Sequence, residues 1–167
     1  MVKICAADPA HISALAAIER AAADLFSEQD LPAGVREETV PPEQHLAAQR
    51  EGLLLVAIEG ETPVGYAVNQ RVGDHLHLLQ IDVHPRHQRQ GIGTALLRQV
   101  ETLALASRCV GITLTTFSHV PWNGPWYQSQ GFCILPREDQ PPYIRDTLEQ
   151  EQKKGLDHRV AMLKPLP

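Results

Sequence analysis

Residues 81–97 read Ile81-Asp82-Val83-His84-Pro85-Arg86-His87-Gln88-Arg89-Gln90-Gly91-Ile92-Gly93-Thr94-Ala95-Leu96-Leu97. An apolar strand ends in this stretch, a polar loop follows, and two glycines open a helix with apolar residues at helical spacing. Glycines let the backbone approach a ligand closely, and the free N–H groups and dipole of a helix start favour an anion. Between Val83 and Val100 there are arginines but no acid, in a chain whose net charge is −5. This local charge reversal predicts a phosphate-bearing ligand at the loop.

Two well-known phosphate-binding motifs do not fit this loop. A dinucleotide fingerprint needs a third glycine where Leu96 stands, and an acidic residue about 20 positions further on. A Walker loop needs Gly-Lys followed by Ser or Thr, which the chain lacks. The glycine pair taken alone also has a purely structural explanation, because a closely packed helix needs small residues too.

The residues on both sides of the loop predict a mixed α/β sheet in the order β-α-α-βββ-α-β-α-β-(α)-β. The expected strands are 2–5, 53–58, 63–72, 76–83, 110–116, 131–135 and 159–163. The expected helices are 9–26, a short one within 27–42, 42–50, 91–106, a short one opening at 123, and 143–154.

Length and composition predict one packed domain over residues 1–167, because 43% of the residues are hydrophobic and 21% are charged. The acidic balance argues against a nucleic-acid partner. No apolar run is long enough for a bilayer span or a signal peptide, so we expect no membrane association. Cys5, Cys109 and Cys133 are widely spaced and include no C-x-x-C. They favour a reduced, cytoplasmic protein without a disulfide scaffold or a zinc site.

A second motif lies downstream and reads Asn123-Gly124-Pro125-Trp126-Tyr127-Gln128-Ser129-Gln130-Gly131-Phe132. With it, the chain resembles the GNAT superfamily of acetyl-CoA-dependent N-acetyltransferases. The family's phosphate loop is matched by Gln88-Arg89-Gln90-Gly91-Ile92-Gly93, preceded by Val83-His84-Pro85. Both motifs occur in the family's order, and the expected order of elements extends the resemblance over nearly the whole chain.

The resemblance implies a GNAT-like mixed, mostly antiparallel sheet of about seven strands flanked by helices, with strands four and five splayed into a cleft. It implies acetyl-CoA as cosubstrate, with backbone amides from Gln88 to Thr94 around the pyrophosphate. The N–H of Val83 would polarise the thioester carbonyl and hold the oxyanion, and Asn123 would contact the CoA arm. The implied donor-binding residues are Ile81, Val83, Gln88, Arg89, Gln90, Gly91, Ile92, Gly93, Thr94 and Asn123.

Two side chains are candidates for catalysis. Tyr127 matches the family tyrosine that protonates the departing thiolate, and a phenol with a pKa near 10 can do so, although an aromatic beside Trp126 can also be simple packing. His77 falls where some members carry a glutamate base, and a histidine of pKa near 6.5 suits that role as well as a solvated strand position. The pair formed by His75 and His77 lacks a third ligand, so we expect no metal. Cys133 is better explained as a small core residue than as a nucleophile, which favours direct transfer.

For the acceptor, the resemblance places the first two helices and their loop around the site. Phe26, Glu28 and Trp122 are the candidate binding residues. An acidic wall would attract a cationic amine, although a solvated helix face explains the same charges. The acids of this region are Glu19, Asp24, Glu28, Asp30, Glu37, Glu38 and Glu43, against Arg20 and Arg36.

The sequence thus predicts an N-acetyltransferase that acetylates a primary amine, a small molecule, by direct attack in a ternary complex. Two alternatives stay open: a protein acetyltransferase acting on a lysine or an N-terminus, and a non-catalytic acyl-CoA-binding module. Since many family members are dimers, a homodimer is compatible with the resemblance.

Overall fold

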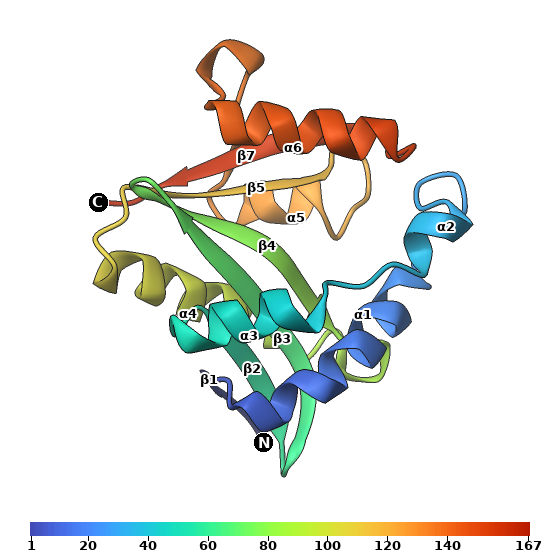
Figure 1. The fold of residues 1–167 in the computed structure, drawn as a ribbon, viewed down its shortest axis with the longest axis vertical. Coiled ribbons are helices and arrows are strands. Elements are labelled where there is room, and N and C mark those ends of the chain that lie inside the picture. Colours follow the sequence, from blue (N-terminus) through green and yellow to red (C-terminus); the bar gives the residue numbers. More distant parts are fainter.

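A computed structural model describes all residues from Met1 to Pro167. One seven-stranded sheet runs through the molecule in the order β1-β2-β3-β4-β5-β7-β6 (Figure 1). Neighbouring strands are antiparallel except for β4 and β5, which are parallel. The strands are β1 (Val2–Ala6), β2 (Leu54–Glu59), β3 (Thr62–Val72), β4 (His75–Val83), β5 (Gly111–Phe117), β6 (Cys133–Ile134) and β7 (Arg159–Pro165). The predicted mixed, mostly antiparallel sheet is therefore confirmed.

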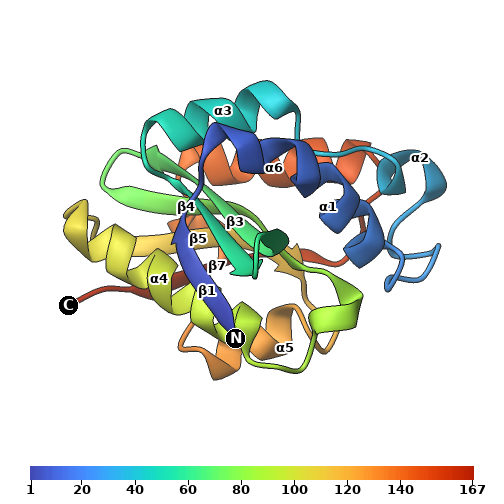
Figure 2. The ribbon, with the colours of Figure 1, turned by 90° about the horizontal axis from the view of Figure 1, so that it is seen from below.

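Helices cover both faces of the sheet. Figure 2 shows α1, α3 and α6 over one face, with α4 and α5 over the other. The helices are α1 (Leu15–Ala23), α2 (Ala33–Arg36), α3 (Pro42–Arg50), α4 (Ile92–Ala106), α5 (Gly124–Ser129) and α6 (Pro142–Lys153). Short 3-10 helices occupy Pro9–Ala14, Pro85–His87 and Arg137–Asp139. No helix has the length and apolar composition needed to cross a membrane.

Most boundaries lie within one or two residues of the predicted ones, and two elements differ in kind or extent. The helix expected over 9–26 is divided, because Pro9–Ala14 form a 3-10 helix and only Leu15–Ala23 are α-helical. The strand expected over 131–135 is reduced to Cys133–Ile134, since Gly131 adopts a left-handed φ of 95° that ends α5 with a tight turn.

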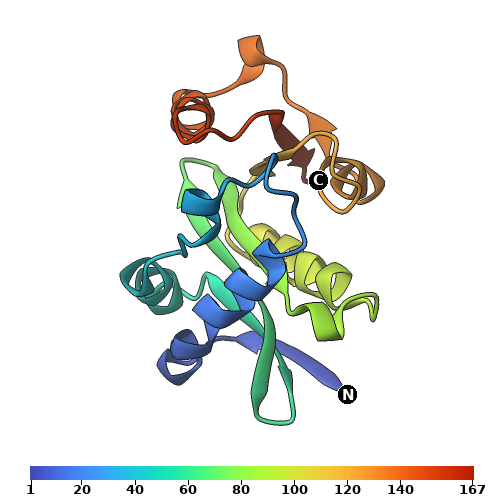
Figure 3. The same ribbon diagram turned by 90° about the vertical axis from the view of Figure 1, so that its right-hand side faces the viewer.

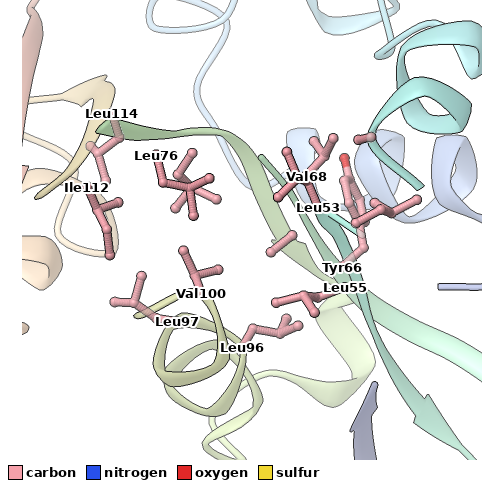
Figure 4. Packing of buried hydrophobic residues seen from close by; sticks show 14 of the residues in the cluster. Leu53, Leu55, Tyr66, Val68, Leu76, Leu96, Leu97, Val100, Ile112 and Leu114 are labelled. Carbon is pink, nitrogen blue, oxygen red and sulfur yellow. The ribbon is translucent and has the colours of Figure 1, made fainter. Parts of the chain in front are cut away.

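The core forms where α4 packs against the sheet (Figure 4). Leu96, Leu97 and Val100 lie on one face of α4 and are fully buried or nearly so. They face Leu76 on β4 and Ile112 on β5, which are also fully buried. Each such side chain removed from water contributes about 1.5–3 kcal/mol, so this contact fixes the start of α4, and with it the glycine loop, against β4.

Strands β4 and β5 diverge within the sheet. They pair only where His75–His77 lie beside Gly111–Thr113. Beyond that point β4 continues beside β3 to Val83, and β5 continues beside β7 to Phe117. Figure 3 shows the molecule from the side, with β5, β7 and α6 separated from the layer that holds β3 and β4. The predicted splay of strands four and five is confirmed.

Candidate active site

The wedge between β4 and β5 opens into two cavities. The first, which we call the Glu19 cavity, has a volume of about 380 Å³ and lies between the α1–α3 segment and β4, β5, α6 and β7. The second, the Gly91 cavity, has a volume of about 500 Å³ and lies between the glycine loop, the end of α1 and α5. Both volumes suit small-molecule ligands. The residues that line both cavities are Phe26, Ile81, Asp82, Asn123 and Tyr127.

The Gly91 cavity is built on the start of α4. Gly91 is the residue before the helix and has a left-handed φ of 80°, and Arg89 is also left-handed at 59°. The side-chain amide of Gln88 donates to the Val83 carbonyl at 3.2 Å and ties the loop to the end of β4. The first N–H groups of a helix have no partner inside it, so α4 offers them, with its dipole and Arg89, to an anion. This arrangement fits a pyrophosphate.

The predicted donor-binding residues converge on this cavity with one exception. The exception is Gln90, whose side chain is exposed and does not line the cavity. The lining residues among them are Ile81, Val83, Gln88, Arg89, Gly91, Ile92, Gly93, Thr94 and Asn123. Trp126, which the sequence did not assign to the donor, also lines this cavity, and its ring would lie 3.8 Å from a Cβ placed on Gly93.

Asp82 is the acidic group where the two cavities meet. It lies directly opposite Tyr66 in the β3–β4 ladder, so both side chains are on the same face of the sheet. The Tyr66 hydroxyl donates to Asp82 Oδ2 at 3.0 Å, and Gln80 Nε2 donates to the same oxygen at 2.9 Å. The pKa of Asp82 is raised to about 7: burial is the largest cause and the charge of Glu19 adds to it, while the hydrogen bonds from Gln80 and Tyr66 act in the opposite direction. A carboxyl with this pKa can accept a proton near neutral pH.

Glu19 on α1 is the second carboxylate of this region. The Val40 backbone N–H donates to its Oε1 at 2.8 Å. Burial raises the pKa of Glu19, and the Val40 bond, Arg20 and Tyr66 partly offset that increase. The sequence counted Glu19 only as one acid among several and gave Asp82 no role. The available signal was a single acid within the apolar end of β4.

Tyr127 on α5 faces the same junction. It is 7% exposed and lines both cavities. Burial raises the pKa of Tyr127 above its ordinary value, and the nearby Asp82 raises it further. Its phenol therefore keeps its proton throughout the neutral range.

His77 lies away from the junction. It is 5% exposed and lines neither cavity. Its Nδ1 is 2.9 Å from Oγ1 of Thr113, and its ring packs edge-on against Tyr143 of α6. Burial lowers the pKa of His77 to about 4. The structure thus argues against the predicted role of His77 as base, because the side chain is held where β4 and β5 still pair.

The predicted acceptor residues separate in the structure. Phe26 lines both cavities, and its ring is 5.5 Å from the rings of both Phe117 and Trp122. Trp122 lines only the Gly91 cavity and is 48% exposed, so it belongs to the donor side. Glu28 is exposed and lines neither cavity.

The cysteines and histidines form no further reactive centre at the site. Cys133 is exposed on β6, contrary to the expected core position, and none of the three cysteines lines either cavity. His75 lies beside Asp74, with His75 Nδ1 3.0 Å from Asp74 Oδ1. No three histidine, cysteine, aspartate or glutamate side chains are close enough to hold a metal ion.

Comparison with known proteins identifies the class of protein that this fold and loop define. A family model described as the acetyltransferase (GNAT) family matches residues 15–132. The chain therefore belongs to the GNAT acetyltransferase family. Members of this family transfer an acetyl group from acetyl-CoA to amine acceptors, so the chain is an acetyl-CoA-dependent acyltransferase.

Solved structures show the same fold at low sequence identity. The paia N-acetyltransferase of Thermoplasma acidophilum, in complex with coenzyme A, is 18% identical with a TM-score of 0.74, and 99% of each chain is covered. The ribosomal-protein-S18-alanine N-acetyltransferase of Escherichia coli is 21% identical with a TM-score of 0.69, covering 99% of this chain and 94% of that one. N-acetylglutamate synthase of Neisseria gonorrhoeae, complexed with coenzyme A and N-acetyl-glutamate, is 18% identical with a TM-score of 0.76, covering 100% of this chain and 35% of that one.

Proposed function

We propose that the chain acetylates a small-molecule primary amine by direct transfer within a ternary complex. The observation that carries this proposal is the meeting of the two cavities at Asp82, Tyr127 and Ile81. The Gly91 cavity offers the anion-binding helix start that the donor needs, and the Glu19 cavity offers a separate space for the acceptor. Donor and acceptor can therefore be bound at the same time.

On the donor side, the N–H groups from Arg89 to Thr94 hold the pyrophosphate, and Ile81 and Val83, beyond the point where β5 leaves β4, face the pantetheine arm. Asn123, at the start of α5, contacts the same arm. When bound, acetyl-CoA supplies the acetyl group as an activated thioester. Since no cysteine lines either cavity, the chain offers no thiol for an acyl-enzyme, which favours direct transfer.

Asp82 is the general base of this proposal, in place of His77. It accepts a proton from the substrate ammonium, which frees the nitrogen lone pair to form the new C–N bond as the C–S bond breaks. Tyr127 donates a proton to the departing sulfur. After the C–N bond has formed, the nitrogen loses a second proton, which passes to the Tyr127 oxygen and restores the phenol. Asp82 then releases its proton to solvent, so the reaction gives amide, thiol and one proton.

Contacts across the Glu19 cavity favour a small acceptor over a protein. Two contacts tie the α1–α3 segment to the opposite side of the cavity. Lys154 at the end of α6 pairs with Glu38 at 3.0 Å, and His119 after β5 contacts Asp30 at 2.8 Å. A protein substrate would need an open groove at this place.

The test is a screen of primary amines and of peptides with free N-terminal and lysine amines, each with acetyl-CoA, following release of free thiol. We expect turnover with at least one small amine, reduced by about 10²-fold or more in Asp82→Asn, and unchanged in the exposed control Asp139→Asn. Turnover with peptides only, or acetyl-CoA binding without any turnover, would overturn the proposal.

A further inference from the structure

The cationic side chains that line the Glu19 cavity are already paired. Arg36 donates to the backbone carbonyls of Ala23, Phe26 and Leu31 at 2.7–3.1 Å, so it closes the α1–α2 loop instead of facing a ligand. Lys154 pairs with Glu38. Arg36 also lies 3.8 Å from Asp24 Oδ1, so both cations already have an acidic partner.

Arg159 is the third cation of the cavity and is the most completely satisfied. It donates to both carboxylate oxygens of Glu151, at 3.2 and 3.0 Å, and to the carbonyl of Thr115 at 3.2 Å. Its guanidinium also lies over the Phe117 ring, 4.6 Å from the centroid. Because Glu151 and Arg159 cancel each other, an anionic group bound beside them would find no net positive charge.

The acids of the cavity differ in whether a cation neutralises them. Glu38 and Glu151 are each neutralised by a cation, as described above. Glu19 and Asp82 have no cationic partner within salt-bridge distance, and both are linked to Tyr66. These two acids lie together beside Tyr66, so the cavity has one acidic site for an ammonium group, at the junction with the Gly91 cavity. Its remaining acids, Glu38 and Glu151, are paired with cations, which leaves no separate acidic site for a second ammonium.

The wall away from this pair of acids combines the paired charges described above with a group of apolar side chains. Phe26 and Phe117 contribute aromatic rings in contact with each other. Leu31, Val35 and Leu156 complete the wall. A volume of about 380 Å³ corresponds to roughly a dozen water volumes, which suits one ring or a short aliphatic chain.

We infer that the acceptor is an apolar monoamine without a carboxylate, an arylalkylamine or alkylamine whose ammonium lies between Glu19 and Asp82 and whose body lies against Phe26 and Phe117. This inference rests on the proposed function and names its substrate class. It separates the chain from acetyltransferases of amino acids, which would need a free cation in the cavity, and from those of polyamines, which would need a second acidic site apart from Glu19 and Asp82.

The experiment compares probes that differ by one charge. Phenethylamine is measured against L-phenylalanine, with L-phenylalaninamide as the steric control, and butylamine against putrescine. We expect kcat/KM for phenethylamine to exceed that for L-phenylalanine by about 10²-fold or more, since the carboxylate would be buried without a partner. L-phenylalaninamide should recover most of the loss, and butylamine should exceed putrescine. A preference for L-phenylalanine or for putrescine, or rejection of the amide as strongly as of the acid, overturns the inference.

A single substitution tests, independently of the choice of amines, whether the Glu151–Arg159 pair excludes a substrate carboxylate. Glu151→Gln leaves Arg159 with an uncompensated charge, so the ratio of kcat/KM for L-phenylalanine to that for phenethylamine should rise by about tenfold. Glu149→Gln, which changes an exposed acid on the same helix, should leave the ratio unchanged. An unchanged ratio in Glu151→Gln would contradict the role assigned to the Glu151–Arg159 pair.

Calorimetry separates failure of this inference from failure of the proposed function. Phenethylamine and L-phenylalanine are each titrated into the protein, and acetyl-CoA is titrated separately. Preferential binding of phenethylamine without turnover supports the inference and overturns the proposed function. Turnover of small amines with preference for L-phenylalanine or putrescine supports the proposed function and overturns the inference.

Discussion

Asp82 and His77 lie on the same strand, and their surroundings move their pKa values in opposite directions. Burial lowers the pKa of His77 to about 4 and raises that of Asp82 to about 7. In a regular strand an odd spacing places two side chains on opposite faces. A β-bulge changes this alternation, because Leu78 pairs with Asn69 while Gln80 pairs with the adjacent Val68. Both side chains therefore face the layer of α1 and α6, but only Asp82 reaches the cavities.

Tyr66 and Glu19 tune the pKa of Asp82 with opposite signs. The hydrogen bond from Tyr66 favours the ionised carboxylate, whereas the charge of Glu19 disfavours it. Tyr66→Phe should therefore raise the apparent pKa of the low-pH limb of kcat/KM, and Glu19→Gln should lower that apparent pKa. The measurement is the pH dependence of kcat/KM for each variant, and shifts in the same direction would contradict the assignment of this limb to Asp82.

Tyr127 is expected to act on the leaving sulfur and to contribute little to donor binding. Tyr127→Phe should lower kcat by about 10²-fold or more while acetyl-CoA affinity stays near the wild-type value. Because its pKa is raised, no loss of activity from ionisation of Tyr127 is expected below about pH 10. Steady-state kinetics with calorimetric titration of acetyl-CoA check this, and a kcat near wild type would reduce Tyr127 to a packing residue.

At the scale of elements, the two glycines at the start of α4 are predicted to behave differently. Gly91 has a φ of 80°, so Gly91→Ala should destabilise the protein by about 1–2 kcal/mol although no atom lies within 4 Å of the new Cβ. Gly93 is helical and its Cβ would only touch Trp126 at 3.8 Å, so Gly93→Ala should leave the free energy of unfolding unchanged or raise it.

Acetyl-CoA affinity should fall in both variants, because each new methyl group lies where the loop backbone approaches the donor. Denaturant unfolding of each variant gives the free energy of unfolding, and calorimetric titration gives the affinity for acetyl-CoA. Loss of affinity in Gly93→Ala without loss of stability assigns the glycine to binding. Unchanged affinity in both variants would remove the basis of the pyrophosphate site.

The sequence predicted best what depends on neighbouring residues. The glycine loop, the start of α4 and the position of Tyr127 on α5 follow from local patterns, and the structure brings these residues to one junction. The proposed base was not predictable in the same way. Whether His77 or Asp82 reaches the cavities depends on the bulge near Leu79 and on where β4 leaves β5, whose paired residues are 36 positions apart. Those contacts join residues that are far apart in the chain, so they produce no periodic pattern of apolar residues in the sequence.

At the scale of the whole molecule, the buried carboxyl of Asp82 lowers the stability of the folded state near neutral pH. Its folded-state pKa of about 7 lies above the ordinary value of 3.8, so the folded state binds its proton more tightly than the unfolded state. Its stabilising contribution is complete below about pH 4 and is lost as the pH rises to about 7. Asp82→Asn should therefore raise Tm by several degrees at pH 8 and have little effect at pH 4. Thermal unfolding at both pH values tests this, and an equal shift at the two values would contradict it.

The most direct test of the account is the pH–rate profile of the wild type beside Asp82→Asn and His77→Gln, with acetyl-CoA saturating and a small amine as acceptor. For the wild type, kcat/KM should rise through an apparent pKa of about 7, in addition to the rise caused by the amine's own ionisation. Asp82→Asn should lose that limb, and His77→Gln should retain it. A limb that persists in Asp82→Asn, or that disappears in His77→Gln, would contradict the assignment of the base to the junction of the two cavities.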